Sequence, residues 1–215
     1  MTKILALSDV ELPAVYSARI RERFPDVDLA ISCGDLPYYY LEYVLTTLDI
    51  PLYYVHGNHV TEVQQADGGT REEPWGAVNL HRKVVYDSTL DLILAGIEGS
   101  LRYSHKPHQY SQARMWWMVL GLIPGLLWNK LRRGRYLDIF VTHSAPEKIQ
   151  DDTDLPHRGI KAFRWLIKVF KPRLHLHGHI HLYSPIKPWK TCFAKTLVVN
   201  AYGYREISWP LPQDW

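Results

Sequence analysis

Short apolar runs recur along the 215-residue chain, and each ends at a small or polar residue. They lie at Ile4–Ser8, Leu29–Cys33, Leu52–Val55, Leu92–Ile97, Ile139–Thr142, Leu174–Leu176 and Leu197–Asn200. Apolar runs of this length, bounded by Gly, Asp, Asn or His, are typical of buried strands. The pattern therefore predicts seven buried strands.

Helical patterns separate several of these runs. Pro13 fits the first position of a helix that continues through Ala14–Phe24, and Tyr38–Leu48 is a second candidate. Ile160–Phe170 is the clearest candidate, because its apolar residues recur at helical spacing while its Lys and Arg residues lie off that stripe. Strands that alternate with helices predict an α/β fold with a largely parallel sheet, here as one domain over residues 1–215.

Polar residues follow five of the apolar runs, at the point where each run ends. They are Asp9, Gly34-Asp35, Gly57-Asn58-His59, His143 and Gly178-His179-Ile180-His181. Because ligands bind at the carboxyl ends of the strands in open α/β sheets, we expect these side chains at one edge. A single aspartate after a strand is more often a turn former, and a single histidine more often a hydrogen-bonded core or surface group. Five coincidences of the same kind favour a shared site instead.

Metal chemistry explains these residue types. Carboxylates, imidazoles and a side-chain amide together suit Mn, Fe or Zn better than Ca or Mg. An aspartate can bridge two cations through its two oxygens, and two cations about 3.5–4 Å apart can activate a shared hydroxide and hold a phosphate for in-line attack. The glycines beside these residues let the backbone turn sharply and approach the site. The pattern therefore indicates a two-metal centre that acts on a phosphate ester.

The ordered motifs resemble those of the calcineurin-like metallophosphoesterases. The pattern of that family is Asp-x-His, Gly-Asp, Gly-Asn-His, His and Gly-His-x-His, and the order here is the same from Asp9 to His181. The resemblance implies an α/β fold built as a four-layer α/β/β/α sandwich, with two mixed sheets flanked by helices. It also implies a dinuclear metal centre.

The resemblance further implies a role for each matching residue. Asp35 would bridge the metals, Asp9 and His181 would bind the first metal, and Asn58, His143 and His179 would bind the second. His59 would stabilise the transition state or protonate the leaving oxygen.

The chain departs from the family pattern at two positions. Glu11 stands where the family has a histidine ligand. Glu11 either binds the first metal or faces solvent, in which case that metal is weakly held or absent. Val60 stands where an acidic residue often follows Gly-Asn-His, and Glu62 is the nearby carboxylate that could replace it in orienting a metal-site imidazole.

The segment Met115–Trp128 is apolar apart from Gly and Pro, and Lys130, Arg132, Arg133 and Arg135 follow it. It is too short to span a bilayer, which takes about 20 residues. Its glycines and Pro124 argue against one straight helix. A tryptophan-rich segment beside a basic cluster suits an anionic membrane surface, so Met115–Arg135 is a candidate for membrane contact. A buried helix or a dimer contact is the alternative.

Composition narrows the function. The formal net charge of +3 gives no strong nucleic-acid signal, and two cysteines make no disulfide scaffold, which fits a cytoplasmic protein. We expect metal-dependent hydrolysis of a small phosphate ester, with a diester favoured over a monoester. Mn is the favoured metal, and Fe or Zn are alternatives. The rival functions are a non-catalytic interaction scaffold with a degenerate metal site, a nuclease, and a lipid-phosphate hydrolase at the inner membrane surface.

Overall fold

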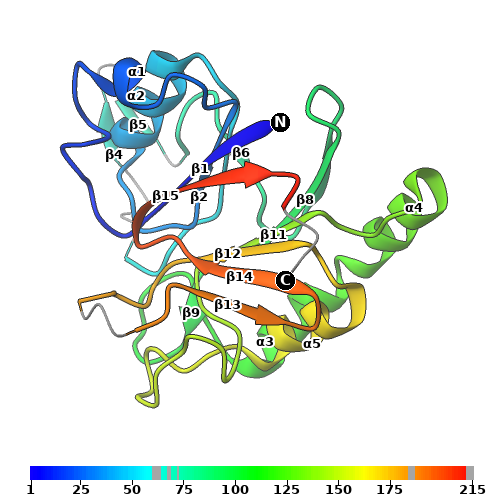
Figure 1. Cartoon of the computed structure of the whole chain (residues 1–215). Coiled ribbons are helices and arrows are strands. Elements are labelled where there is room, and N and C mark those ends of the chain that lie inside the picture. Colours follow the sequence, from blue (N-terminus) through cyan, green and yellow to red (C-terminus); the bar gives the residue numbers. More distant parts are fainter. Residues whose placement is uncertain (60–63, 67–68, 72, 184–186, 212–215) are drawn as a thin grey trace.

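The computed structural model describes residues 1–59, 64–66, 69–71, 73–183 and 187–211, and its centre consists of two sheets (Figure 1). The first sheet has the strand order β15-β1-β2-β3-β6. These strands are β1 (Thr2–Ser8), β2 (Leu29–Ser32), β3 (Leu52–Tyr54), β6 (Val78–Asn79) and β15 (Gly203–Trp209). Strands β1, β2, β3 and β6 are parallel, whereas β15 runs antiparallel to β1 at the edge.

The second sheet has the order β13-β14-β12-β11-β8-β7. Its strands are β7 (Val84–Asp87), β8 (Leu92–Ile97), β11 (Ile139–Thr142), β12 (Leu174–His177), β13 (Lys190–Phe193) and β14 (Thr196–Asn200). The four inner strands are parallel and both edge strands are antiparallel. Two short ladders join β9 (Ser100–Leu101) to β10 (Gln109–Tyr110), and β4 (Gln64–Ala66) to β5 (Gly69–Arg71).

Helices cover the outer faces of both sheets, which gives four layers. The helices α1 (Ile20–Arg23) and α2 (Tyr38–Leu48) pack on the first sheet, whereas α3 (Gln112–Leu120), α4 (Ile123–Arg133) and α5 (Lys161–Phe170) belong to the second. In β1, Ile4 and Ala6 enter the core between the sheets, while Leu5 and Leu7 pack toward α1 and α2. Because side chains alternate across a strand, a strand buried on both faces is continuously apolar. The predicted α/β/β/α sandwich of two mixed sheets is confirmed.

All seven predicted strands are present, within two residues at each end. The predicted helix Tyr38–Leu48 has the same bounds in the structure, and Ile160 is the N-cap of α5. The prediction for Ala14–Phe24 is wrong, because the helix there spans Ile20–Arg23. Val15 and Ile20 are both fully buried, and residues five apart lie on different faces of a helix. The chain therefore turns between them to bring both side chains into the core.

Met115–Trp128 spans two helices that meet around Gly121. The expectation that this segment is not one straight helix is confirmed. The inner face of this pair is buried and includes Met115, Val119 and Leu126. The outer face leaves Trp117 71% exposed, and the two helices also expose Leu120, Leu127, Trp128 and Leu131. In the part of the chain that the structure describes, each helix is too short or too polar to cross a bilayer.

Candidate metal centre

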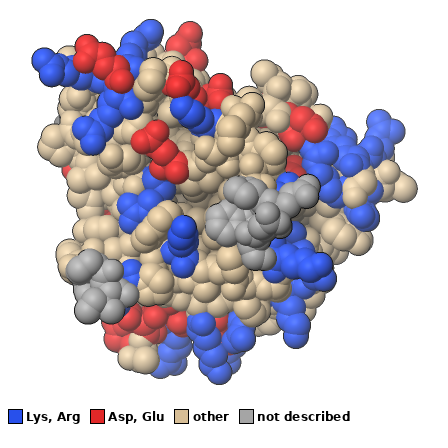
Figure 2. Space-filling view, in the orientation of Figure 1, with Lys and Arg blue, Asp and Glu red and all other residues tan. Residues whose placement is uncertain are grey.

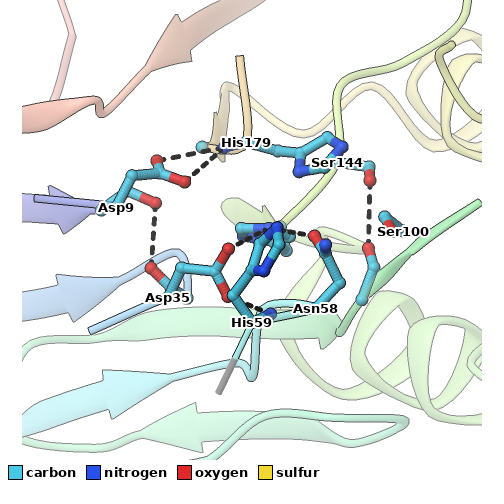
Figure 3. Close-up of polar contacts among 12 residues, drawn as sticks. Asp9, Asp35, Asn58, His59, Ser100, Ser144 and His179 are labelled. Atoms are coloured by element: carbon cyan, nitrogen blue, oxygen red, sulfur yellow. Dashed lines mark hydrogen bonds and ion pairs between the residues drawn. The ribbon is translucent and has the colours of Figure 1, made fainter. Parts of the chain in front are cut away.

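The predicted ligands come together where strands of both sheets end. Asp9 follows β1, Asp35 lies beyond β2, His143 follows β11 and His179 lies beyond β12. Figure 3 shows Asp9, Asp35, Asn58 and His179 gathered in one region, with the Asp9 carboxylate directed at the backbone nitrogen of His179. Parallel strands in each sheet place these ends at the same edge, which is the physical basis of the convergence.

Three of these residues adopt a left-handed backbone conformation. The φ angles are 67° at Asp9, 55° at Asp35 and 65° at His179. Such angles are uncommon for residues other than glycine, and they cluster at functional sites. Gly57 permits the close approach of the neighbouring loop, because a Cβ atom at this position would overlap the Asp35 carboxylate.

His143 presents one ring nitrogen to two oxygen atoms of the site. Its Nδ1 donates to the carbonyl of Cys33 at 2.7 Å. Its Nε2 lies 2.9 Å from Oδ1 of Asn58 and 3.3 Å from Oδ2 of Asp35. Because a carbonyl can only accept, the Cys33 contact leaves Nε2 as the atom that can bind a cation.

His179 is oriented in the same way. Its Nε2 donates to the carbonyl of Pro156 at 2.9 Å, which leaves Nδ1 available to a cation. One ligand atom each from Asp35, His143 and His179 lies within 4.8 Å of the others. Two imidazoles with fixed tautomers, an amide oxygen and a carboxylate form a donor set that suits a transition metal.

Burial and the Asp35–His143 pair together set the pKa values of the residues in the centre. Burial alone would lower the pKa of His143, but the charge of Asp35 and its hydrogen bond raise it to about 9. A cation that binds Nε2 would therefore displace the proton on that atom, whereas the Nδ1 proton stays on the Cys33 carbonyl. The same pair holds the pKa of Asp35 below its ordinary value, although burial acts in the opposite direction. Burial lowers the pKa of His179 to about 3, with a further contribution from the charge of His143. The neutral His179 ring therefore keeps a lone pair for a metal.

The other side of the centre is formed by Asp9 and His181. Both carboxylate oxygens of Asp9 accept from the backbone N–H of His179, at 3.0 and 3.1 Å. Nε2 of His181 lies 3.9 Å from Oδ1 of Asp9. Burial raises the pKa of Asp9, whereas the side chain of His181 is partly exposed. A cation held between Asp9 and His181 would stabilise the ionised form of this buried carboxylate.

A family model described as calcineurin-like phosphoesterase matches residues 2–183. The chain belongs to this family. Membership implies metal-dependent hydrolysis of small phosphate esters. No curated protein matches the chain at a significant level.

Solved structures share the fold of this phosphoesterase at low sequence identity. One crystal structure is 14% identical, covers 95% of this chain and 94% of its own, and has a TM-score of 0.63. The protein TT1561 of Thermus thermophilus is 18% identical over 94% of this chain and 89% of its own, with a TM-score of 0.59. Vacuolar Protein Sorting 29 from Cryptosporidium parvum is 12% identical over 93% of this chain and 73% of its own, with a lower TM-score of 0.44.

Glu11 lies on the exposed side of the phosphoesterase centre. Its carboxylate accepts a hydrogen bond from the hydroxyl of Tyr39, and this bond raises the pKa of Tyr39 to about 12. Metal binding by Glu11 stays a prediction. The other position that departs from the family pattern, Val60, and its substitute Glu62 lie outside the described residues.

The structure adds one residue that the sequence analysis missed. The Tyr103 hydroxyl accepts from Nδ2 of Asn58 at 2.8 Å and lies 3.3 Å from Nε2 of His59. Tyr103 therefore orients the amide whose oxygen faces His143, and it touches the predicted acid. The available signal was the polar sequence that follows the Leu92–Ile97 run, where the other strands also place site residues.

His157 is a second residue near the centre. Its ring lies 5.0 Å from that of His179, and its Nδ1 lies 2.7 Å from Asp154. His157 is partly exposed and lies beside His179 at the edge of the centre.

Proposed function

We propose that this phosphoesterase hydrolyses a phosphate diester in preference to a monoester, with two divalent cations of which Mn²⁺ is favoured. The observation that carries the proposal is the convergence of Asp35, Asn58, His143 and His179, with both imidazole tautomers set by backbone carbonyls. A protein with no metal-dependent chemistry has no need for two histidines that are held in this way. When bound, the cations would supply Lewis acidity and a nucleophilic water.

The residues of the chain would then divide the work. Asp35 would bridge the cations, as the family resemblance implies. Its Oδ2 faces His143 and its Oδ1 accepts from the His59 backbone. Asp9 and His181 would hold one cation, and Asn58, His143 and His179 the other. His59 would act on the phosphoryl group or the leaving oxygen.

An open cleft of about 550 Å³ lies beside the Asp9 side of the centre. Val10 and Leu182, which line it, directly follow Asp9 and His181 in the chain. Tyr202 also lines the cleft, and its ring lies 4.8 Å from the ring of His181. A cleft with both polar and apolar walls suits the alcohol portion of an ester whose phosphate sits at the cations.

The diester preference rests on charge. If Glu11 joins Asp9 and Asp35 in the first shell, the centre carries one more negative charge than a centre with histidine at position 11. A less positive centre attracts a phosphate dianion less, and a monoanionic diester is affected less. The additional oxygen ligand also favours Mn²⁺ over Zn²⁺.

The test combines elemental analysis with a substrate panel. Protein freed of metal and refilled with Mn²⁺ is assayed against matched mono- and diesters of one alcohol. The expected result is at least two ions per chain and a higher kcat/KM for the diester. Full metal occupancy without turnover of any ester would overturn the enzyme proposal and favour the scaffold. Cleavage of plasmid or oligonucleotide DNA at a higher kcat/KM than small diesters would favour the nuclease.

A second proposal concerns the outer face of α3 and α4. Trp117, Trp128 and Leu131 are 71%, 58% and 78% exposed. Figure 2 shows Lys and Arg side chains gathered over the projecting α4, and Lys130 and Arg132 on this helix are exposed. An apolar face beside cationic groups fits an anionic membrane surface, so we infer peripheral attachment through Met115–Arg135.

The end of this proposed membrane-contact surface at Arg135 lies away from the metal centre. Arg135, just after α4, pairs with Asp91 and Asp138, which precede β8 and β11. The metal ligands instead follow the carboxyl ends of their strands, at the opposite edge. The position therefore supports recruitment to a cytoplasmic membrane face more than hydrolysis of a lipid in the same membrane.

A further inference from the structure

A second cluster of metal-ligating side chains lies outside the predicted centre. His56 and Glu98 are buried, and His108 lies against them. Oε2 of Glu98 is 3.2 Å from Nδ1 of His56, and Oε1 is 3.0 Å from Nδ1 of His108. The rings of His56 and His108 stack with centroids 4.9 Å apart. Two imidazoles and one carboxylate thus converge on one small volume.

The backbone fixes the three segments that carry these side chains. His56 follows β3, Glu98 follows β8, and His108 directly precedes β10. The N–H of Gly99 donates to the carbonyl of His56 at 2.9 Å, and the N–H of Ser100 donates to that of His108 at 3.0 Å. The cluster is therefore held by strand ends and by backbone hydrogen bonds, as a preorganised ligand set should be.

His81 belongs to the surroundings of the cluster and not to its ligand set. Its Nδ1 accepts from the backbone N–H of Glu98 at 3.1 Å, so in the neutral ring Nε2 carries the proton. That Nε2 lies 3.5 Å from Oε1 of Glu98, where it can donate. Tyr110 donates to the same oxygen at 2.6 Å. These two donors provide the outer contacts that usually orient a metal-bound carboxylate.

The tautomer of His56 is compatible with a cation as well. Its Nε2 lies 3.3 Å from the hydroxyl of Tyr38, an oxygen to which an N–H can donate. With the proton on Nε2, Nδ1 is a bare nitrogen that faces Glu98. Atoms bound at about 2.1 Å to one ion lie about 3.0 Å apart in octahedral and about 3.4 Å apart in tetrahedral geometry. The 3.2 Å contact from Oε2 of Glu98 to Nδ1 of His56 falls within that range, so Oε2 is the oxygen that would bind the ion while Oε1 accepts from Tyr110 and His81.

We propose that His56, Glu98 and His108 form an additional cation site, distinct from the predicted dinuclear centre, that takes Zn²⁺ or a similar transition-metal ion. A His₂Glu set is a known zinc and iron donor combination. The competing account is a hydrogen-bonded network in which both imidazoles donate to Glu98. Three hydrogen-bonding groups, from Tyr110, His108 and His81, crowd around the single oxygen Oε1 of Glu98, which has two lone pairs. A cation in place of ring protons relieves this crowding.

The site would have a positioning role. It joins the start of the segment 98–110 to His56, and the same segment carries Tyr103, which contacts Asn58 and His59. An ion bound here would fix the Tyr103 hydroxyl relative to the catalytic loop. The low exposure of Glu98, 7% for its side chain, makes the cluster unsuited to receive a substrate.

The direct test is anomalous diffraction at the zinc absorption edge from crystals of the full chain loaded with Zn²⁺. A peak between His56, Glu98 and His108, separate from any peak at Asp35, is the expected result. Occupied peaks at the predicted centre with no density at this cluster would overturn the proposal. This readout does not depend on phosphoesterase activity, so it can succeed or fail independently of the proposed function.

Elemental analysis of variants provides the second arm, again with Zn²⁺ in excess. His108→Ala should lose one ion per chain, whereas His105→Ala, which removes an exposed histidine of the same segment, should lose none. Asp35→Asn should keep the ion at this cluster. If His108→Ala does not fold, Glu98→Gln replaces it, because the amide preserves size and removes the anionic ligand. Equal ion content in the wild type and the folded ligand variant would refute the site.

Discussion

The backbone N–H of His59 donates to Oδ1 of Asp35 at 2.8 Å, across 24 residues of sequence. This bond ties the loop that carries the predicted acid to the carboxylate that is predicted to bridge the metals. It also engages one Asp35 oxygen while the other faces His143. The two residues are therefore held together by this hydrogen bond but have different predicted roles. Mutation of each residue should affect metal binding and turnover differently.

Asp35→Asn should lose bound metal and nearly all turnover. An amide cannot supply two anionic oxygens to two cations, and it also removes the negative partner of His143. Metal content per folded chain and kcat are the measurements. A variant that retains both metals of the centre and normal turnover would remove Asp35 from the bridging role.

His59→Ala should keep the metals and lower kcat by about 10²–10⁴-fold, the usual contribution of general acid–base catalysis. The loss should shrink for esters with very acidic leaving groups, because these need no proton. His105→Ala is the matched control, since it makes the same substitution at an exposed histidine to which no role in the centre is assigned. Equal losses across all leaving groups would assign His59 to phosphate binding or charge stabilisation instead.

Glu11→His should raise monoesterase activity relative to diesterase activity, because it restores positive charge to the centre. Glu11→Gln is the control that removes the charge without adding an imidazole, and it should move the ratio in the same direction. The ratio of the two kcat/KM values on matched esters is the measurement. An unchanged ratio in both variants would contradict the charge argument and favour a first metal that is weakly held or absent.

The protein should float with anionic vesicles at low salt and detach at high salt, because exposed charges are screened over about 8 Å already at physiological ionic strength. Replacing both Trp128 and Leu131 by Ala should abolish flotation. Val169→Ser, at an exposed apolar position on α5, should leave it unchanged. Absence of wild-type binding to anionic vesicles at low salt would favour an interface between copies, which sedimentation would detect.

His175 should make the fold sensitive to acid. It is completely buried in β12, its Nε2 lies 2.9 Å from Oγ1 of Thr142, and burial lowers its pKa well below 6.5. Below pH 6.5 the unfolded chain takes up a proton that the folded chain does not, so the free energy of unfolding falls as the pH is lowered. The slope per proton is about 1.4 kcal/mol for each pH unit.

His175→Gln removes the titrating ring. Below pH 6.5 the variant should take up at most about one proton fewer on unfolding, so its free energy of unfolding should fall less steeply as the pH is lowered. Denaturant unfolding at several pH values measures the slope, with His105→Ala as an exposed control. An identical slope in wild type and His175→Gln would assign the acid sensitivity to other buried groups, of which His177 is the nearest, with a pKa lowered to about 4 mainly by burial.

Local patterns were sufficient for the inner strands of the sheets and for the list of candidate metal ligands. The seven predicted strands are continuous apolar runs because they are buried on both faces, and that signal lies within each run. The edge strand β7 carries a weaker signal, since its residues Val84–Asp87 are only partly buried, and it was missed. The candidate ligands Asp9, Asp35, Asn58, His143, His179 and His181 share one signal, because each lies within five residues of the end of a run.

Tertiary contacts decided the rest. The carbonyl of Cys33, 110 residues away, determines which ring nitrogen of His143 is available to a metal. The carbonyl of Pro156 determines the same for His179. The shortening of the first helix depends on the burial of both Val15 and Ile20 in the same core. Hydrogen-bond partners and core packing of this kind join distant parts of the chain, so local patterns predict the residues of a site but not the directions in which their atoms face.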